Sequence, residues 1–371
     1  MSIIYFDNNA TTKVDDLVLQ EMIEVYKLPV NASATHQLGR KGYEIVENAR
    51  KSVKNLLNAD NYDVIFTGTS TEATNMLFNG LETNKILRSG IEHAATYNCC
   101  PEGKEAIEIE SLNTAIVDLE DIKNKLQNLS DPNFLISVML ANSEVGTIQP
   151  VAEIAKLTHQ KGGLIHCDVV QAAGKIEVDL EKLNVDFATI SAHKINGPQG
   201  VGALLVRKGI NLKPLILGGG QENSKRAGTI NTAGIAGFGK ACEIAKEKPA
   251  KYKKIQELRD YLEQEIVKIA KDDIKIFGCD VKRLPNTSYL SLAYADAQAQ
   301  LINFDLNNIC VSAGSACSSG SSKASRVLKS IKATPDFIDS AVRVSLSTEN
   351  TKEEIDKFIS VWHEFYKRHK S

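Results

Sequence analysis

The sequence contains no long hydrophobic run and no excess of charge of either sign. Its most hydrophobic stretch, residues 134–141, is far shorter than the roughly 20 residues that a transmembrane helix needs. Lys and Arg number 44 against 46 Asp and Glu, so the net charge is −2. This balance gives no electrostatic reason to expect nucleic acid or an anionic membrane as a partner. We therefore expect neither a membrane protein nor a nucleic-acid-binding protein.

The N-terminus and the cysteines lack two further signals. The first residues include Asp7, Asp15 and Asp16 and no apolar core behind a basic start, so we do not expect a signal peptide. The seven cysteines are odd in number, and only Cys99 and Cys100 are neighbours. This pattern matches neither a disulfide framework nor the spacing of zinc ligands. We expect most cysteines to be reduced and buried, and the protein to be cytoplasmic.

The length and the hydrophobic pattern predict two domains. A chain of 371 residues is too long for one compact core. From about residue 60 to 210, short apolar runs such as 134–140 alternate with amphipathic stretches such as 151–161. This alternation predicts an α/β domain, with a mostly parallel sheet and helices on both faces. Ligands bind beyond the carboxyl ends of such strands, so we expect the chemistry there.

The pattern changes near residues 247–249. Apolar residues at spacings of three and four then predict a long helix, with Pro249 in its first turn. Short strands (287–292 and 342–346) and a final amphipathic helix from residue 352 follow. We predict a large domain of residues 13–246. Residues 1–12 and 247–371 are predicted to form a smaller α+β domain.

Two polar residues stand at the ends of predicted strands. Lys194 follows the apolar run 187–191, and Asp168 ends the run 164–167. A lysine at a strand end is most often a solvated surface residue. At the ends of adjacent parallel strands, however, a lysine and a carboxylate are the minimal constellation that binds pyridoxal phosphate (PLP). The amine bonds the cofactor covalently, and the carboxylate keeps the ring nitrogen protonated.

A phosphate site is also predicted. The apolar run 64–66 leads through Thr67-Gly68-Thr69 into Ser70 and Thr71, and then into a helical run. A glycine turn at a helix start offers free backbone N–H groups and a favourable dipole to an anion, and the two hydroxyls add donors. A helix N-cap without a ligand is the commoner use of such a sequence and stays open as the alternative.

The most unusual segment is 312–322, in which every residue is Ser, Ala, Gly or Cys and Cys317 stands at the centre. Little apolar surface and high backbone freedom predict a mobile loop. One interpretation is a flexible linker that contains a cysteine. The other is a carrier that moves sulfur between two places, because an exposed thiol is a chemical liability unless it is used.

Five motifs occur in order along the whole chain. They are Tyr-Phe-Asp-Asn-Asn-Ala-Thr-Thr (5–12), Glu-His (92–93), His-Cys-Asp-Val-Val-Gln (166–171), Ser-Ala-His-Lys (191–194) and Ser-Ala-Gly-Ser-Ala-Cys (312–317). Together they resemble the NifS/IscS-type cysteine desulfurases, which are class-V aminotransferase-like PLP enzymes of fold type I. The resemblance implies that fold, PLP as cofactor, and conversion of L-cysteine to L-alanine with a persulfide left on Cys317.

The resemblance also implies roles around the cofactor ring. Lys194 would bind PLP covalently and later transfer protons. Asp168 would pair with the ring nitrogen, and Gln171 would bond the ring oxygen. His93 would stack on the ring and assist proton transfer; its alternative is a core histidine whose hydrogen bonds are satisfied.

Further roles concern the phosphate, the dimer and the substrate. By resemblance, Thr229 would reach the phosphate of a neighbouring subunit, which implies a homodimer. Arg343 would fork onto the substrate carboxylate, with a surface ion pair as its alternative. Asn31 would be a second substrate contact. The implied phosphate cradle consists of Ser70, Thr71, Ser191 and His193.

Several positions depart from the family pattern. Ala32 stands in the segment where the family has Gly-Asn-Pro-Ser-Ser, and Ser143 replaces an asparagine that holds the ring oxygen. Gln221 and Asn223 replace a histidine and an arginine. These changes put the sulfur acceptor and the rate in question more than the reaction type.

Alternatives remain at the level of function. A selenocysteine lyase or an aminotransferase would share the scaffold, but neither needs a cysteine on a mobile loop. A degenerate relative that only binds partners is a further alternative. The sulfur acceptor is open between an iron–sulfur scaffold, a tRNA-thiolation protein and another carrier. No resident metal is expected, although a transient iron–sulfur cluster shared between Cys317 and a scaffold protein is left open.

Overall fold

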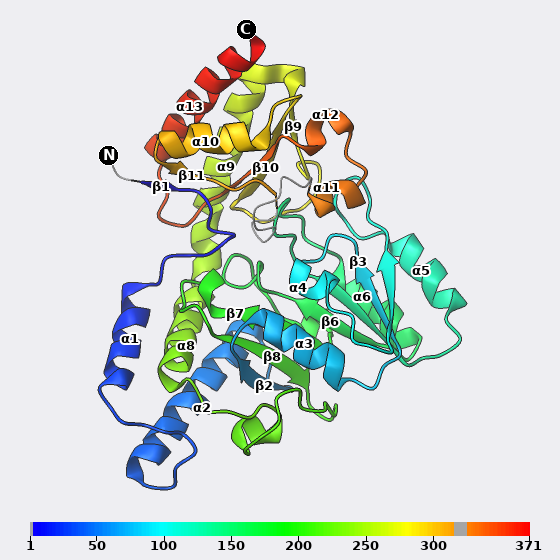
Figure 1. Cartoon of the computed structure of the whole chain (residues 1–371), viewed down its shortest axis with the longest axis vertical. Helices are drawn as coiled ribbons and strands as arrows, with labels where there is room; N and C mark the ends of the chain where they lie inside the picture. Colours follow the sequence, from blue (N-terminus) through cyan, green and yellow to red (C-terminus); the bar gives the residue numbers. More distant parts are fainter. Residues whose placement is uncertain (1–2, 315–324) are drawn as a thin grey trace.

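The computed structural model describes residues 3–314 and 325–371. A seven-stranded sheet forms the centre of the larger of its two assemblies (Figure 1). The strand order is β2-β8-β7-β6-β5-β3-β4. Neighbours from β7 through β6, β5 and β3 to β4 are parallel, whereas β8 runs antiparallel to both β2 and β7. The predicted mostly parallel sheet is therefore confirmed. Its strands are β2 (Tyr62–Thr67), β3 (Lys85–Ser89), β4 (Glu105–Ile109), β5 (Phe134–Met139), β6 (Leu164–Asp168), β7 (Phe187–Ser191) and β8 (Gly202–Arg207).

Helices cover the sheet, and we call this assembly the α/β unit. Every residue of β5 is buried, as expected for a strand covered on both faces. Gly239 of α8 allows α2 to approach closely, because a Cβ at this position would lie 2.7 Å from Cα of Ala49. The helices of the unit are α1 (Asp16–Tyr26), α2 (Gln37–Leu57), α3 (Ser70–Gly80), α4 (Ala94–Tyr97), α5 (Leu119–Asn128), α6 (Val151–Gln160), α7 (Leu180–Leu183) and α8 (Thr232–Lys246), with 3-10 turns η1 (Ala192–Lys194) and η2 (Gln221–Ser224).

A smaller assembly, the C-terminal unit, lies above the α/β unit in Figure 1. An antiparallel sheet of order β12-β10-β9 and a parallel pair of β1 with β11 form its strands. They are β1 (Ile4–Tyr5), β9 (Ile274–Ile276), β10 (Thr287–Leu292), β11 (Ile309–Cys310) and β12 (Ala341–Ser345). The helices are α9 (Lys248–Ala270), η3 (Lys271–Asp273), α10 (Ala297–Leu306), α11 (Arg326–Ser330), α12 (Pro335–Ile338) and α13 (Lys352–Lys370).

The N-terminal strand belongs to the core of the C-terminal unit. Phe6 is fully buried and packs in one cluster with Phe304, Phe358 and Trp362. The chain then leaves this core and runs toward the α/β unit, where the backbone N–H of Thr12 donates to the carbonyl of His193 at 3.0 Å. The domain boundaries at residues 13–246 and 247–371 stay a prediction.

Local sequence signals set the ends of the long helices. Helix α9 begins at Lys248 with Pro249 in its first turn, as the sequence predicted. Helix α13 begins at Lys352, where Thr351 and Glu354 form a reciprocal capping box. Among the helices of the two described ranges, none combines the length and apolar content that crossing a bilayer requires.

Candidate active site

The predicted lysine and aspartate lie at the same edge of the sheet, at the ends of two neighbouring strands. Strand β6 ends at Asp168, strand β7 ends at Ser191, and Lys194 closes the 3-10 turn that follows β7. The strands are adjacent and parallel, with Asp168 in register with Thr189. Their carboxyl ends therefore meet, and the structure bears out the arrangement that the sequence predicted for Asp168 and Lys194.

The N-terminal segment crosses this edge and contacts the lysine. The Lys194 Nζ donates to the backbone carbonyls of Asn9 at 2.5 Å and Ala10 at 2.6 Å. Thr12 fixes the segment from the other side, because its hydroxyl donates to the carbonyl of His193 at 2.8 Å. The amine of Lys194 is thus held at the carboxyl ends of the strands, where ligands bind in sheets of this type.

Asp168 is a buried carboxylate, with 8% of its surface exposed. Its Oδ1 accepts a hydrogen bond from the Val170 backbone N–H at 2.8 Å. Burial raises the pKa of Asp168 to about 6, although the Val170 N–H and the charge of Lys194 act in the opposite direction. A further positive charge nearby, such as the protonated ring nitrogen of PLP, would lower this pKa and ionise the carboxyl group fully.

His93 is neutral at physiological pH. It is the N-cap of α4, and its Nδ1 accepts a hydrogen bond from the Ala95 backbone N–H at 3.2 Å. Burial lowers the pKa of His93 to about 4, and Lys194, Arg326 and Arg343 add to the effect. Because Nδ1 accepts, the proton of the neutral ring is on Nε2.

Glu92, the residue before His93, is a buried acid. Its Oε1 accepts from the Ser89 hydroxyl at 2.6 Å and from the Met139 N–H at 2.9 Å. Its Oε2 has no hydrogen-bond partner among the described residues. Burial raises the pKa of Glu92 to about 8, so its carboxyl is largely protonated at neutral pH.

The predicted phosphate cradle lies where three strands meet in register. Gly202 of β8 pairs with Thr67 of β2 on one side and with Ser191 of β7 on the other. A Cβ at Gly202 would lie 2.9 Å from the backbone nitrogen of Ser70, so only glycine allows this approach to the start of α3. The turn before α3 and the end of β7 thereby flank the same strand, β8, and a helix N-terminus suits the binding of an anion.

Thr69 rather than Ser70 caps α3, since its side chain accepts from the Glu72 N–H. Ser70 and Thr71 are the first two helical residues, the positions at which backbone N–H groups lack helical partners. The Nδ1 of His193 lies 3.1 Å from the hydroxyl of Thr11. Burial, followed by the charge of Lys194, lowers the pKa of His193 to about 4, so its ring is neutral.

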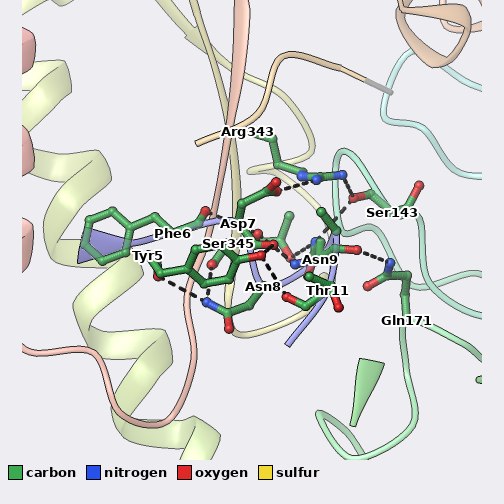
Figure 2. A network of polar contacts seen from close by, with 12 residues as sticks. Tyr5, Phe6, Asp7, Asn8, Asn9, Thr11, Ser143, Gln171, Arg343 and Ser345 are labelled. Carbon is green, nitrogen blue, oxygen red and sulfur yellow. Dashed lines mark hydrogen bonds and ion pairs between the residues drawn. The ribbon is translucent and has the colours of Figure 1, made fainter. Parts of the chain in front are cut away.

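Arg343 is buried in strand β12, with 3% of its surface exposed. Its Nη2 lies 2.6 Å from Oδ1 of Asp7, and its Nη1 donates to the Ser143 carbonyl at 3.0 Å (Figure 2). Its Nε is buried and has no hydrogen-bond partner among the described residues. The alternative of a surface ion pair is therefore wrong, because the guanidinium of Arg343 is buried.

The structure places two further predicted residues in different parts of the α/β unit. Asn31 is in the connection between α1 and α2, which Figure 1 shows at the lower end of the α/β unit, and its Oδ1 caps the N–H of Ser33 at 3.0 Å. Within one chain it is not brought to Lys194. Thr229 lines a cavity of about 130 Å³ together with Thr67 and Gly68, so it lies near the phosphate turn of its own chain.

The cysteines give a mixed result. Cys317 lies outside the described residues. Of the described cysteines, Cys99, Cys167 and Cys242 are buried, whereas Cys100 and Cys279 are exposed and Cys310 is intermediate. All six are free, but fewer are buried than the sequence led us to expect. Within the described ranges no cluster of His, Cys, Asp or Glu has the composition of a metal site.

Asn9 and Lys175 received no role from the sequence, yet both lie in the centre of the site. The backbone carbonyl of Asn9 accepts from Lys194 and also from Nε2 of Gln171 at 3.0 Å. Its side-chain Oδ1 accepts from Nζ of Lys175 at 2.8 Å. One sequence feature could have pointed to this part of the site: Lys175 is a charged residue in the otherwise apolar run that follows Gln171.

An α/β fold with a lysine and a carboxylate at adjacent strand ends defines a fold-type-I PLP-enzyme architecture, and the comparisons agree. The chain belongs to the aminotransferase class-V family, whose model matches residues 4–358. A cysteine desulfurase of Nostoc sp. is 37% identical over 380 residues, covering 99% of this chain and 94% of the relative.

Two further matches support the same assignment. A cysteine desulfurase IscS of Dictyoglomus turgidum is 37% identical over 370 residues, covering 96% of this chain and 93% of the relative. The X-ray structure of a NifS-like protein from Rickettsia africae has a TM-score of 0.91 and 36% identity, with coverage of 98% of this chain and 99% of that chain. Within the class-V family, the chain is thus a member of the cysteine desulfurases, and the resemblance seen in the sequence is confirmed.

Proposed function

We propose that the protein converts L-cysteine to L-alanine and leaves the sulfur as a persulfide on Cys317. The observation that carries the proposal is the meeting of Lys194, Asp168 and neutral His93 at one edge of the sheet, in a chain of the cysteine desulfurase family. The reaction balances without an external oxidant. L-cysteine and the Cys317 thiol become L-alanine and a persulfide, as a C–S bond breaks and an S–S bond forms.

The residues present fit PLP. Lys194 would hold it covalently, Asp168 would face its ring nitrogen, and Gln171 would donate to its ring oxygen. Gly202 lets strand β8 pack against the backbone at the start of α3, where the phosphate group would bind. When bound, PLP supplies an electron sink for the bonding electrons of the substrate. The remaining contacts to the phosphate would come from Ser70, Thr71, Ser191 and His193, with Thr229 of a neighbouring subunit.

The chain's own side chains bind the substrate and move its protons. The buried guanidinium of Arg343 would hold the substrate carboxylate through a planar, bidentate contact. Lys194, which follows β7 at the carboxyl ends of the strands, would take and return a proton at the substrate Cα. His93 would assist proton transfer as a donor through Nε2. Its ring is neutral and its Nδ1 already accepts a hydrogen bond, so the proton of the ring is on Nε2.

The setting of the reaction is part of the proposal. A thiol that carries sulfur requires a reducing compartment, so we propose a cytoplasmic enzyme. A homodimer would let Thr229 complete the phosphate site of the other subunit. The sulfur would pass to an acceptor protein, either an iron–sulfur scaffold or a tRNA-thiolation protein; the name IscS of one relative favours the first.

Borohydride reduction tests the cofactor assignment and alanine formation tests the reaction. The purified protein, supplied with PLP, should be yellow, and after reduction a peptide containing Lys194 should carry the cofactor mass. Incubation with L-cysteine and a thiol reductant should yield alanine and sulfide in equal amounts, and Lys194→Ala should yield neither. A folded parent protein that binds PLP but forms no alanine would contradict the proposal and favour the non-catalytic alternative.

A further inference from the structure

Lys175 is a buried lysine for which the proposed reaction has no use. It is 2% exposed and follows Asp168 and Gln171 in the chain of turns beyond β6. Gly174, with a φ of +72°, sets the turn immediately before it, a conformation that favours glycine. The Nζ of Lys175 lies 2.7 Å from Oε1 of Gln171 and 2.8 Å from Oδ1 of Asn9. One amine thus bridges two side-chain amides.

The bridge orients the amide of Gln171. It is one of several contacts that orient the amide of Asn9, whose Oδ1 also accepts from Nδ2 of Asn286 at 3.2 Å and whose Nδ2 also donates to the Thr287 hydroxyl at 2.9 Å. An amide has an oxygen that only accepts and a nitrogen that only donates, whereas the lysine amine acts here as a donor. Lys175 therefore binds the oxygen of Gln171 and leaves the nitrogen on the other side. That nitrogen, Nε2, donates to the Asn9 carbonyl, the same oxygen that accepts from Lys194. Nε2 carries a second N–H, which is available for the cofactor.

The same bridge reaches the substrate side through Asn9. With Oδ1 bound to Lys175, the Nδ2 of Asn9 donates to the carbonyl of Ser143 at 3.2 Å. This carbonyl is also the acceptor for Nη1 of Arg343 (Figure 2). A continuous set of hydrogen bonds therefore joins Lys175 to the residue proposed to hold the ring oxygen and to the residue proposed to hold the substrate.

Packing alone does not explain a lysine here. A buried amine without a carboxylate partner is costly, and an apolar side chain of similar length would fill the same volume at lower cost. Burial, then the charges of Lys194 and Arg343, holds the pKa of Lys175 well below its usual value. Loss of the charge leaves the bridge intact, because a neutral amine keeps two N–H donors and faces two acceptors.

We propose that Lys175 is a positioning residue that fixes the amide of Gln171, so that Gln171 presents an N–H to the ring oxygen of the cofactor. The inference rests on the proposed function, since it requires PLP in this site. Lys175 itself touches neither cofactor nor substrate in this assignment; it acts through Gln171. Its removal should therefore alter the cofactor's environment and not merely lower the activity.

The test is an absorbance–pH titration of the PLP-loaded Lys175→Met protein beside the parent. An N–H donor favours the ionised form of the ring oxygen, so its loss should move the midpoint of the visible transition upward by about 0.4–1 pH unit. PLP should dissociate roughly two- to tenfold more readily. Lys175→Arg, which keeps donors at this position, should restore part of both values.

A double-mutant cycle separates positioning from general destabilisation. If Lys175 acts through Gln171, Lys175→Met should shift the midpoint in the parent but have little further effect in a Gln171→Met background. Equal shifts in both backgrounds would overturn the inference. Should Lys175→Met fail to fold, Lys175→Gln, which is too short to reach both acceptors, is expected to give the same shift and the same cycle.

Lys104→Met is the control. Lys104 is partly buried, less so than Lys175, and precedes β4 at the amino ends of the parallel strands, the edge opposite the site. It should leave the titration unchanged. If the parent binds PLP and the titration of Lys175→Met matches that of the parent, this inference is contradicted while the proposed function stands. A folded parent that takes up no PLP would contradict the proposed function first.

Discussion

The guanidinium of Arg343 and the carboxylate of Asp7 form a partly buried ion pair of 2.6 Å between strand β12 and the segment that leaves β1. The side chain of Arg343 is 4% exposed and that of Asp7 is 17% exposed. Asp7 therefore already binds one nitrogen of the guanidinium, Nη2, when no substrate is bound. A second anion, such as a substrate carboxylate, would have to share this cation with Asp7.

Arg343→Lys should weaken substrate binding without changing the cofactor. Lysine keeps the charge but loses the planar fork, and a hydrogen bond to a charged group is worth about 1.5–3 kcal/mol. We expect KM for L-cysteine to rise roughly 10- to 100-fold, while the visible absorbance of bound PLP stays the same. Steady-state kinetics and a spectrum of the same sample measure both quantities. An unchanged KM would remove Arg343 from the substrate site.

Glu92→Gln should make the protein more stable at alkaline pH. The pKa of Glu92 in the folded protein, about 8, lies above its ordinary value of 4.5, so the folded state binds more protons than the unfolded chain between these values. Stability from this group is therefore present below about pH 4.5 and is lost as the pH rises toward 8. A neutral glutamine does not titrate and escapes this loss.

Urea unfolding of both proteins at pH 5, 6.5 and 8 measures the effect. The difference in unfolding free energy should grow in favour of Glu92→Gln by about 1 kcal/mol per pH unit. Glu108→Gln, a change at an exposed glutamate, serves as a control. Its unfolding free energy should depend on pH in the same way as that of the parent. Parallel curves for the parent and Glu92→Gln would show that Glu92 is not a protonated buried acid.

Ser143→Asn should tighten the binding of PLP. The Ser143 carbonyl is already an acceptor for Asn9 and Arg343, and a change of side chain leaves it in place. An asparagine amide reaches farther than a hydroxyl and would add a donor to the ring oxygen, worth about 0.5–1.5 kcal/mol. Equilibrium dialysis should show roughly two- to tenfold tighter binding, with no gain for Ser143→Ala. Identical affinities would mean that the contact is absent or already supplied by Gln171.

Mixing two inactive proteins should restore activity if the sites are shared across a dimer. Lys194→Ala lacks the lysine, and Thr229→Glu would place a negative charge against the phosphate of the neighbouring subunit. Random exchange leaves about a quarter of all sites intact, so up to about a quarter of the parent activity should return. Light scattering of the parent should give a dimer. A fully active monomer would rule out the shared site.

Much of this site could be predicted because strand ends are visible in a sequence. Asp168 and Lys194 follow buried apolar runs, and parallel pairing of β6 with β7 brings such ends together. The contacts of Asn9 could not be predicted in the same way. Lys175 and Asn9 are 166 residues apart, and their hydrogen bond depends on where the N-terminal segment crosses the sheet edge. The pair of Arg343 with Asp7 joins residues that are 336 positions apart, and it too depends on where the N-terminal segment runs.

The central claim is that Cys317 is the nucleophile that takes the sulfur. The direct measurement is the mass of the 312–322 peptide, together with the alanine formed, after L-cysteine is added to PLP-loaded parent and Cys317→Ser proteins. The parent should show a persulfide on Cys317 and stoichiometric alanine. Cys317→Ser should keep the PLP absorbance and its change on addition of cysteine, since neither uses this thiol, but should form almost no alanine and no persulfide. Substantial alanine from Cys317→Ser would contradict the account, because another cysteine, or none, would then be the sulfur acceptor.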